Sequence, residues 1–201
     1  MCPFCYIGKR KFEDALSNFE ARDQIEVEWK SYQLAQGIET DTSKNTHQFL
    51  AEHKNISITE AKALNAQVAE MAAQVGLEYN FDRSVVANTF NAHRLLHMAK
   101  VHGLQNNVKE SLLRAYFTEG KNIDDIESLT SLASGAGLDA DVVRTMLLSD
   151  EFADAVKADI SEAHQIGVTG VPFFVIDRRF AVSGAQDVAV FSQALERGLA
   201  P

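Results

Sequence analysis

The two cysteines of the chain, Cys2 and Cys5, are separated by two residues, which is close enough for a disulfide within one turn of chain. Such a pair is typical of thiol–disulfide exchange, in which one thiolate attacks and the second resolves the mixed disulfide. A structural pair or half of a zinc site are the alternatives. Zinc needs about four ligands, and the sequence holds no second cysteine pair. The spacing therefore favours redox chemistry.

The residues that follow the cysteines predict a helix. Apolar side chains recur at helical spacing, at Phe12, Ala15, Leu16 and Phe19. Pro3 suits the first helical position, so Cys2 falls at the N-cap, where unpaired N–H groups and the helix dipole stabilise a thiolate. Cys5 lies one turn further in and should be the more buried sulfur. We therefore expect Cys2 to exchange with substrate and Cys5 to resolve.

Three consecutive basic residues, Lys9, Arg10 and Lys11, follow the cysteine pair on the same predicted helix. A solvated helix face is the plain interpretation of such a run. The alternative is that these charges favour the Cys2 thiolate electrostatically.

Composition limits the classes of function. The chain has 201 residues, of which 46% are hydrophobic, and a net charge of −9. An acidic protein is a poor ligand for nucleic acid or for an anionic membrane surface. No apolar run approaches the ~20 residues of a membrane span, and no signal peptide is visible. We expect a cytoplasmic protein, since structural disulfides are also lacking.

Three segments outside the helices have a strand pattern. In Ile25–Tyr32 apolar and polar residues alternate, whereas 173–177 is a continuous apolar run followed by a short strand at 180–183. The last two should form an antiparallel hairpin. The polar stretch 36–45 reads as a linker, and Asp187 should cap a final helix.

The pattern from Thr46 to about Gly167 is helical almost throughout. Ser57 and Glu60 form a capping-box signal, and Gly76 and Gly103 stand where helices should end. This block predicts a helical subdomain of about a hundred residues between the two parts of a mixed α/β unit.

Four separated motifs carry a resemblance to a known family. They are Cys2-Pro-Phe-Cys-Tyr-Ile-Gly8, Asn88-Thr-Phe-Asn-Ala-His-Arg-Leu95, Gly170-Val-Pro172 and Val182-Ser-Gly-Ala-Gln186. The chain resembles the DsbA branch of the thioredoxin superfamily, and within it the FrnE-like group. The resemblance implies an α/β, thioredoxin-like fold formed by residues 1–43 and 166–201, with an all-helical insertion at 44–165.

The resemblance also implies site residues. Val171–Pro172 would be a cis peptide facing the cysteines, and the Val171 backbone would bind an extended substrate together with Phe4 and Pro172. Asn88 and Arg94 are candidates for lining the pocket, although a capping Asn and a surface Arg are plainer interpretations. The site would need no cofactor or metal, with glutathione as a candidate redox partner; a homodimer is left open.

The sequence departs from the family in two places. Strong oxidants of the DsbA type have a His where Phe4 stands, and Phe donates no hydrogen bond, so the Cys2–Cys5 disulfide should be less oxidising. The family also has a central strand before the cysteines, whereas only Met1 precedes them here. We expect the natural product to begin upstream with an apolar strand of about five or six residues.

Two other functions fit the same fold. Glutathione-dependent isomerases and transferases carry Ser in place of Cys2 and favour an acidic–basic pair where this chain has Ala185 and Gln186, so both positions argue against them. A peptide-binding module without catalysis would not need two intact cysteines.

The remaining alternative is a metal protein. His93 and His97 have the i, i+4 spacing of metal ligands on a helix. No Glu follows His93, so the zinc-protease signature is not met. We expect both imidazoles to lie along the edge of the helix's apolar face.

Overall fold

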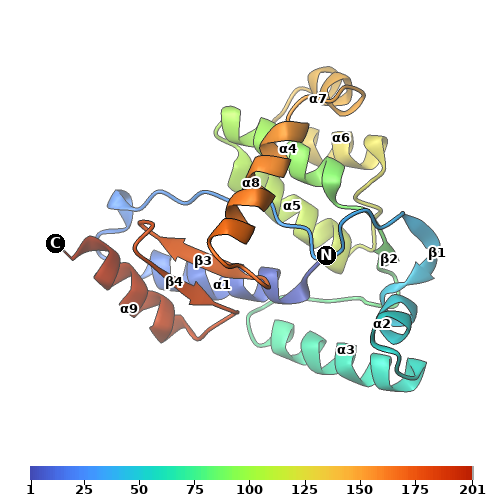
Figure 1. The fold of residues 1–201 in the computed structure, drawn as a ribbon, viewed down its shortest axis with the longest axis horizontal. Coiled ribbons are helices and arrows are strands. Elements are labelled where there is room, and N and C mark those ends of the chain that lie inside the picture. Colours follow the sequence, from blue (N-terminus) through green and yellow to red (C-terminus); the bar gives the residue numbers. More distant parts are fainter. Residues whose placement is uncertain (201) are drawn as a thin grey trace.

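The computed structural model describes residues 1–200 (Figure 1). Its helices are α1 (Pro3–Ser17), α2 (Thr46–Lys54), α3 (Ile58–Ala73), α4 (Phe90–Val101), α5 (Gln105–Phe117), α6 (Ile126–Gly135), α7 (Ala140–Leu147), α8 (Ala153–Gln165) and α9 (Val188–Leu199), with a 3-10 turn at Arg22–Gln24. Its strands are β1 (Asp41–Asn45), β2 (Val85–Val86), β3 (Phe173–Ile176) and β4 (Phe180–Ser183).

Helix α1 is shared by two apolar cores. Tyr6 and Ile7 pack with side chains from α3 to α7 in the larger core. Phe12 and Ala15, further along the same helix, pack with β3, β4 and α9 in the smaller core. In Figure 1 α1 passes behind the β3–β4 hairpin, with the inserted helices α4 to α8 above it. The cysteine-bearing helix therefore joins the two parts of the molecule.

The predicted hairpin is present. β3 pairs antiparallel with β4 in the register Phe173↔Ser183 to Ile176↔Phe180. Three residues connect the strands. Asp177 and Arg178 both have positive φ, and the Arg179 N–H closes the turn by donating to the Ile176 carbonyl at 3.0 Å. The hairpin packs its Phe174 ring against α1 and α9.

The strand expected at Ile25–Tyr32 is absent. The segment is extended, but it pairs with no strand of the described chain. Side chains of α5 and α8 form hydrogen bonds with its backbone groups instead. Gln105 accepts from the Trp29 N–H and donates to the Trp29 C=O, each at 2.9 Å. Asp159 accepts from the Ser31 N–H at 2.8 Å. Alternation in the sequence identified the extended backbone but not its partners.

The segment 36–45, which we expected to be a linker, contains β1. β1 pairs antiparallel with β2 through Asp41↔Val86 and Asn45↔Val85, with an irregular register between them. The inserted block is therefore mostly helical, and the expectation of an all-helical insertion is wrong in this detail. A five-residue polar strand gives no apolar alternation, so sequence periodicity could not show it.

The capping signal at Ser57 and Glu60 placed the start of α3 correctly. The capping box of α3 is present, with Glu60 N–H donating to the Ser57 hydroxyl and the Ser57 N–H donating to Glu60. α2 has a similar box at Asn45. Asp187 stands at the N-cap of α9, but its side chain makes no capping bond, because its carboxylate pairs with Lys11 at 2.9 Å.

Within residues 1–200 no helix combines the length and the apolar character that crossing a bilayer requires.

Candidate thiol–disulfide site

Cys2 occupies the N-cap of α1, with Pro3 at the start of the helix. The Cys5 N–H donates to the Cys2 carbonyl at 3.2 Å, which closes the first turn. Because the backbone N–H groups at a helix start lack intrahelical acceptors, the Phe4 and Cys5 N–H groups act on the Cys2 sulfur and help to lower its pKa.

The two sulfurs differ in acidity. Both cysteines are free thiols in this structure. A hydrogen bond from the Cys5 thiol is the largest influence on Cys2 and lowers its pKa to about 7, against the opposing effect of burial. The same contact and burial raise the pKa of Cys5. Near neutral pH Cys2 is therefore about half ionised while Cys5 keeps its proton, so Cys2 is the sulfur that carries negative charge.

The loop before β3 lies directly over Cys2. The Cys2 thiol donates to the Val171 carbonyl at 3.3 Å, and the Val171–Pro172 peptide bond is cis, as expected. Gly8 on α1 permits this approach: a Cβ there would stand 3.0 Å from the Pro172 ring. The Pro172 carbonyl accepts from the Gly184 N–H at 2.9 Å, which ties the loop to the end of β4.

The basic run does not form a solvated helix face. Lys9 is 1% exposed and pairs with Glu13 at 2.6 Å and with Glu110 at 2.8 Å. Arg10 forms ion pairs with the same two carboxylates, whereas Lys11 turns to Asp187 on the opposite side of α1. Acidic partners thus neutralise these cations, and none of the three is among the main influences on the Cys2 pKa.

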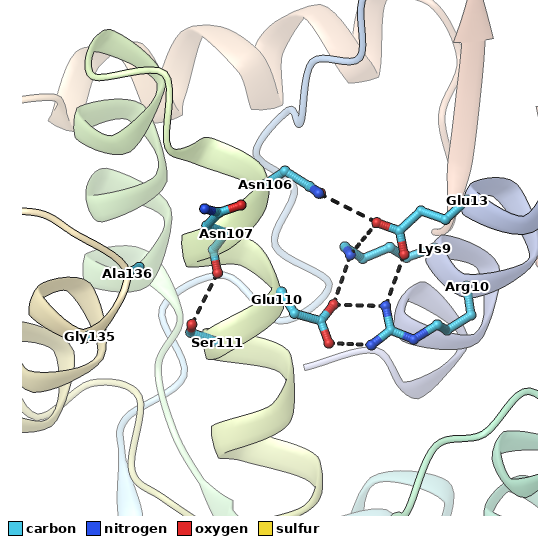
Figure 2. A pocket seen from close by; sticks show the side chains of 9 residues that line it. All are labelled: Lys9, Arg10, Glu13, Asn106, Asn107, Glu110, Ser111, Gly135 and Ala136. Atoms are coloured by element: carbon cyan, nitrogen blue, oxygen red, sulfur yellow. Dashed lines mark hydrogen bonds and ion pairs between the residues drawn. The ribbon is translucent and has the colours of Figure 1, made fainter. Parts of the chain in front are cut away.

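The ion pairs of Lys9 and Arg10 line an open pocket between α1, α5 and the end of α6, with a volume of about 460 Å³. Figure 2 shows these ion pairs. Glu110 of α5 lies at their centre and also accepts from the Tyr6 hydroxyl. The cations and this hydroxyl lower the pKa of Glu110 to about 2. The network fixes α1 against the inserted helix one turn beyond Cys5.

Phe4, between Pro3 and Cys5, is 36% exposed. Its ring offers an apolar surface next to the cysteines, and it forms no hydrogen bond to either sulfur. Tyr79 supports the turn from inside the protein, since its hydroxyl donates to the Pro3 carbonyl at 2.7 Å.

Asn88 has a structural role. Its amide group donates to the Ile38 carbonyl at 2.8 Å, and its side-chain oxygen accepts from the Phe90 N–H at 2.8 Å. These contacts attach the segment before β1 to the first turn of α4. The N-cap of α4 is Thr89, so Asn88 lies one residue before the capping position. Within residues 1–200 no hydrogen bond joins the Asn88 side chain to either cysteine.

Arg94 is buried, at 4% exposed, so the interpretation as a surface residue is wrong. Its guanidinium donates to four main-chain carbonyls between the end of α7 and the start of α8, those of Met146, Leu147, Ser149 and Glu151. Because its N–H groups donate to these carbonyls, Arg94 stabilises the turn between α7 and α8 and has few donors left for a ligand near Cys2.

The two histidines of α4 have different surroundings. His97 contacts Asp159 and the Ser31 hydroxyl, each at 3.1 Å. His93 lies deeper: burial lowers its pKa to about 3, and its Nδ1 has no hydrogen-bond partner. No group of three potential metal ligands occurs in residues 1–200.

Lys109 on α5 is a charged group near the cysteines that the sequence analysis did not identify. Its positive charge acts on Cys5, and burial lowers the pKa of its own amine. The available signal was its spacing, since Gln105, Val108, Lys109 and Leu112 follow the buried-face pattern of α5. A lysine on that face should have raised the question of what it contacts.

Comparisons with known proteins agree with this geometry. A model of the DSBA-like thioredoxin domain matches residues 1–196. The chain is similar to the solved structure of a probable DsbA oxidoreductase from Streptomyces coelicolor, with 40% identity, a TM-score of 0.91, and coverage of 98% of this chain and 85% of that one. It is 28% identical over 203 residues to the uncharacterized protein YwbO of Bacillus subtilis (strain 168), covering 97% of this chain and 91% of that protein. The expected thioredoxin-like fold with a helical insertion is confirmed.

Proposed function

Because the chain belongs to the family of DSBA-like thioredoxin domains, we propose that it is a thiol–disulfide oxidoreductase that uses Cys2 and Cys5. The observation that carries this proposal is the asymmetry of the two sulfurs. Cys2, at a helix N-terminus, has a pKa of about 7, whereas the pKa of Cys5 is raised. An acidic thiol that attacks and a less acidic thiol that follows are the two components that exchange requires.

The reaction proceeds in two exchanges. The Cys2 thiolate attacks a substrate disulfide, forms a mixed disulfide and releases one substrate thiolate. Cys5 loses its proton and attacks the Cys2 sulfur, so the Cys2–Cys5 bond forms and the second substrate thiolate leaves. Substrate is reduced and the protein oxidised; the reverse sequence oxidises a substrate dithiol. The cysteine pair carries the electrons, so no bound cofactor is needed.

Substrate binding would use the surface around Cys2. The backbone of Val171 lies at the attacking sulfur, where an extended peptide could pair with it as an added strand. Phe4 and Pro172 would supply apolar contacts on either side. These roles are consistent with a protein substrate presented as an extended chain.

A matched pair of variants tests the mechanism. Cys2→Ser should abolish the dithiol-dependent reduction of insulin, because the attacking sulfur is gone. Cys5→Ser keeps Cys2 and should accumulate mixed disulfides with insulin chains, visible on non-reducing gels. Activity retained in Cys2→Ser would refute the proposal.

A glutathione-dependent isomerase or transferase on the same fold is the alternative. Such an enzyme activates the thiol of glutathione, so it would tolerate Cys2→Ser and lose activity when glutathione is withheld. The acidic Cys2 thiol argues for the oxidoreductase, with glutathione acting only as a redox partner. Assaying both variants with and without glutathione separates the two functions.

We further propose that the protein is an FrnE-type enzyme and that it is located in the cytoplasm. The acidic net charge of −9 and the lack of any cysteine beyond the Cys2–Cys5 pair support the cytoplasmic location. Fractionation of the host cells should recover it with cytoplasmic markers. Recovery from an extracytoplasmic compartment would contradict this assignment.

A further inference from the structure

The first turn of α1 leaves the Phe4 N–H free for the Cys2 sulfur. Pro3 has no N–H, and the Cys5 N–H donates to the Cys2 carbonyl at 3.2 Å. The Phe4 N–H donates to no backbone carbonyl of residues 1–200. Phe4 is the second helical residue, and a capping side chain accepts from the N–H of the second or third. A Cys2 thiolate, which can only accept, therefore has the Phe4 N–H as a donor.

This N–H belongs to the same peptide group as the Pro3 carbonyl. Resonance couples the oxygen and the nitrogen of a peptide group, so a donor on the oxygen makes the N–H a stronger donor, and hydrogen bonds in such a chain strengthen one another. The Tyr79 hydroxyl donates to the Pro3 oxygen at 2.7 Å. Tyr79 and Cys2 thus lie at the two ends of one chain of hydrogen bonds that passes through the Pro3–Phe4 peptide group.

The position of Tyr79 is fixed by the end of α5. The Asn80 N–H donates to the Phe117 carbonyl at 2.7 Å, and the Thr118 hydroxyl donates to the Glu78 carbonyl at 2.7 Å. The Tyr79 ring also stacks on the Phe117 ring, with centroids 4.7 Å apart. Because both its backbone and its ring are held, the hydroxyl is directed at the first turn of α1 before any substrate binds.

The Tyr79 hydroxyl stays protonated in the pH range in which Cys2 ionises. Burial is the main cause that raises the Tyr79 pKa, and Tyr6, Cys2 and Cys5 act in the same direction, whereas the Arg10 charge opposes them. The hydroxyl therefore remains a hydrogen-bond donor on both sides of the Cys2 titration.

Other groups act on Cys2 by different routes. The Cys5 thiol is the largest influence that lowers the Cys2 pKa, and the Met1 amine acts through its charge. Lys109 of α5 interacts with both sulfurs, and more strongly with Cys5. Within residues 1–200 no hydrogen bond joins the Tyr79 hydroxyl to any of these groups, so its removal leaves them in place.

We propose that Tyr79 is a positioning residue whose hydroxyl, acting through the Pro3–Phe4 peptide group, strengthens the hydrogen bond from the Phe4 N–H to the Cys2 thiolate. The role rests on the proposed oxidoreductase function. A stabilised thiolate makes Cys2 more ionised at neutral pH. It also makes Cys2 a better leaving group when a second substrate thiolate attacks the mixed disulfide, so that the substrate disulfide forms and the Cys2–substrate bond breaks.

The pH dependence of the first reaction with Ellman's reagent (5,5′-dithiobis(2-nitrobenzoic acid)) tests this role, because Cys2 attacks as a thiolate. Tyr79→Phe keeps the ring and removes the donor. The midpoint of the first phase should rise by about 0.2–0.5 pH units, as a ~10–30% weakening of one charge-assisted hydrogen bond implies. The first phase should be up to about twofold slower at about pH 6. At about pH 9 it should be at least as fast as in the wild type, because a less acidic thiol gives the stronger nucleophile.

Tyr116→Phe is the matched control. Tyr116 is a buried tyrosine of the same aromatic core, with its ring centroid 4.9 Å from that of Phe117, and its hydroxyl faces Thr46 of α2 rather than α1. This variant should keep the wild-type midpoint and rates. A midpoint in Tyr79→Phe equal to that of the wild type, or a first phase slowed equally at the two pH values, would overturn the proposal.

A second replacement covers the case in which Tyr79→Phe does not fold. Placing 3-fluorotyrosine at Tyr79 keeps the hydroxyl and makes it a stronger donor, since the fluorinated phenol is more acidic. The midpoint of the first phase should then fall below that of the wild type. A midpoint that is unchanged or higher would overturn the proposal.

Nitrogen-15 NMR separates the route through the peptide group from a direct effect of the hydroxyl on the sulfur. The Phe4 nitrogen shares its peptide group with the Pro3 carbonyl, whereas the Cys5 nitrogen belongs to the next group. Loss or strengthening of the Tyr79 donor should therefore shift the Phe4 resonance more than the Cys5 resonance. A changed midpoint with equal shifts at the two amides would overturn the proposed route.

Insulin reduction by the wild type tests the function separately. Midpoints in the expected order without insulin reduction would refute the oxidoreductase function and support the effect of Tyr79 on Cys2. Insulin reduction with equal midpoints in all variants would overturn the role of Tyr79 and leave the function standing.

Discussion

At the scale of single residues, the acidity of Cys2 has the most direct consequence. Its pKa of about 7 results from the Cys5 thiol and the first N–H groups of α1. Ultraviolet absorbance of the reduced protein should therefore show a thiolate that forms with a midpoint near pH 7, and Cys2→Ser should remove that transition. A wild-type midpoint near ~8.5, the value of a free thiol, would contradict the N-cap geometry.

Phe4 sets a second expectation at this scale. Its ring makes no hydrogen bond to the Cys2 sulfur, so the thiolate form is less favoured than with a donor there. Equilibration with glutathione should give a potential more negative than the ~−120 mV of DsbA. Phe4→His should shift it to a less negative value, whereas Phe4→Leu, which also lacks a donor, should not. A wild-type potential at or above ~−120 mV would show this role of Phe4 to be wrong.

At the scale of elements, the inserted helices α4 and α5 make contacts of two different kinds. α5 contacts α1 through Glu110, whereas α4 uses Arg94 to fasten the end of α7 and the start of α8. The first contact lies one turn from Cys5 and the second belongs to the interior of the insertion. Removing them should therefore have different effects on exchange and on stability.

Arg94→Met tests this distinction. It removes the Arg94 donors from four main-chain carbonyls, of which only that of Met146 keeps bonds from Ser149. The free energy of unfolding should fall by about 3 kcal/mol or more, equivalent to a Tm lower by roughly 6–12 °C for a chain of this size. The rate of exchange between the folded protein and Ellman's reagent should stay within about twofold of the wild-type rate. A twofold change in rate corresponds to about 0.4 kcal/mol in activation free energy. Arg114→Met, at an exposed arginine, is the matched control. A large loss of exchange without loss of stability would place Arg94 in the pocket after all.

At the scale of the whole molecule, two carboxylates join segments that are distant in the sequence. Glu110 links α5 to α1, and Asp159 of α8 binds His97 of α4 together with Lys30 and Ser31 of the extended segment. These partners lower the pKa of each carboxylate to about 2. Both carboxylates are therefore ionised in the folded protein well below their ordinary range.

The sign of the resulting pH dependence follows from the direction of the shifts. A carboxylate whose folded pKa is lowered contributes its full stabilisation above its ordinary pKa, about 4, and loses it as the pH falls toward about 2. Tm should hold above about pH 5 and drop between about pH 4 and about pH 2. The double variant Glu110→Gln/Asp159→Asn should have a lower Tm at neutral pH and a smaller drop in acid. Glu127→Gln, at an exposed carboxylate, should reproduce the wild-type profile.

The sequence by itself determined the features that depend on near neighbours in the chain. The Cys2–Cys5 spacing with Pro3 placed both sulfurs at a helix start, the Ser57–Glu60 signal placed the start of α3, and the two apolar runs near the C-terminus gave the β3–β4 hairpin. Each of these follows from contacts within a few residues, where spacing and capping chemistry suffice.

Only the tertiary structure decided what meets across long separations. It buried Lys9 and Arg94, and it paired the backbone of Trp29 with the Gln105 side chain of α5 rather than with a neighbouring strand. A local pattern shows that a side chain is charged or a backbone extended, but the group that satisfies it lies in another element about 60 to 100 residues away. Burial makes such a partner necessary, because an unpaired polar group inside the protein is costly. Only the packing of the elements against one another selects that partner.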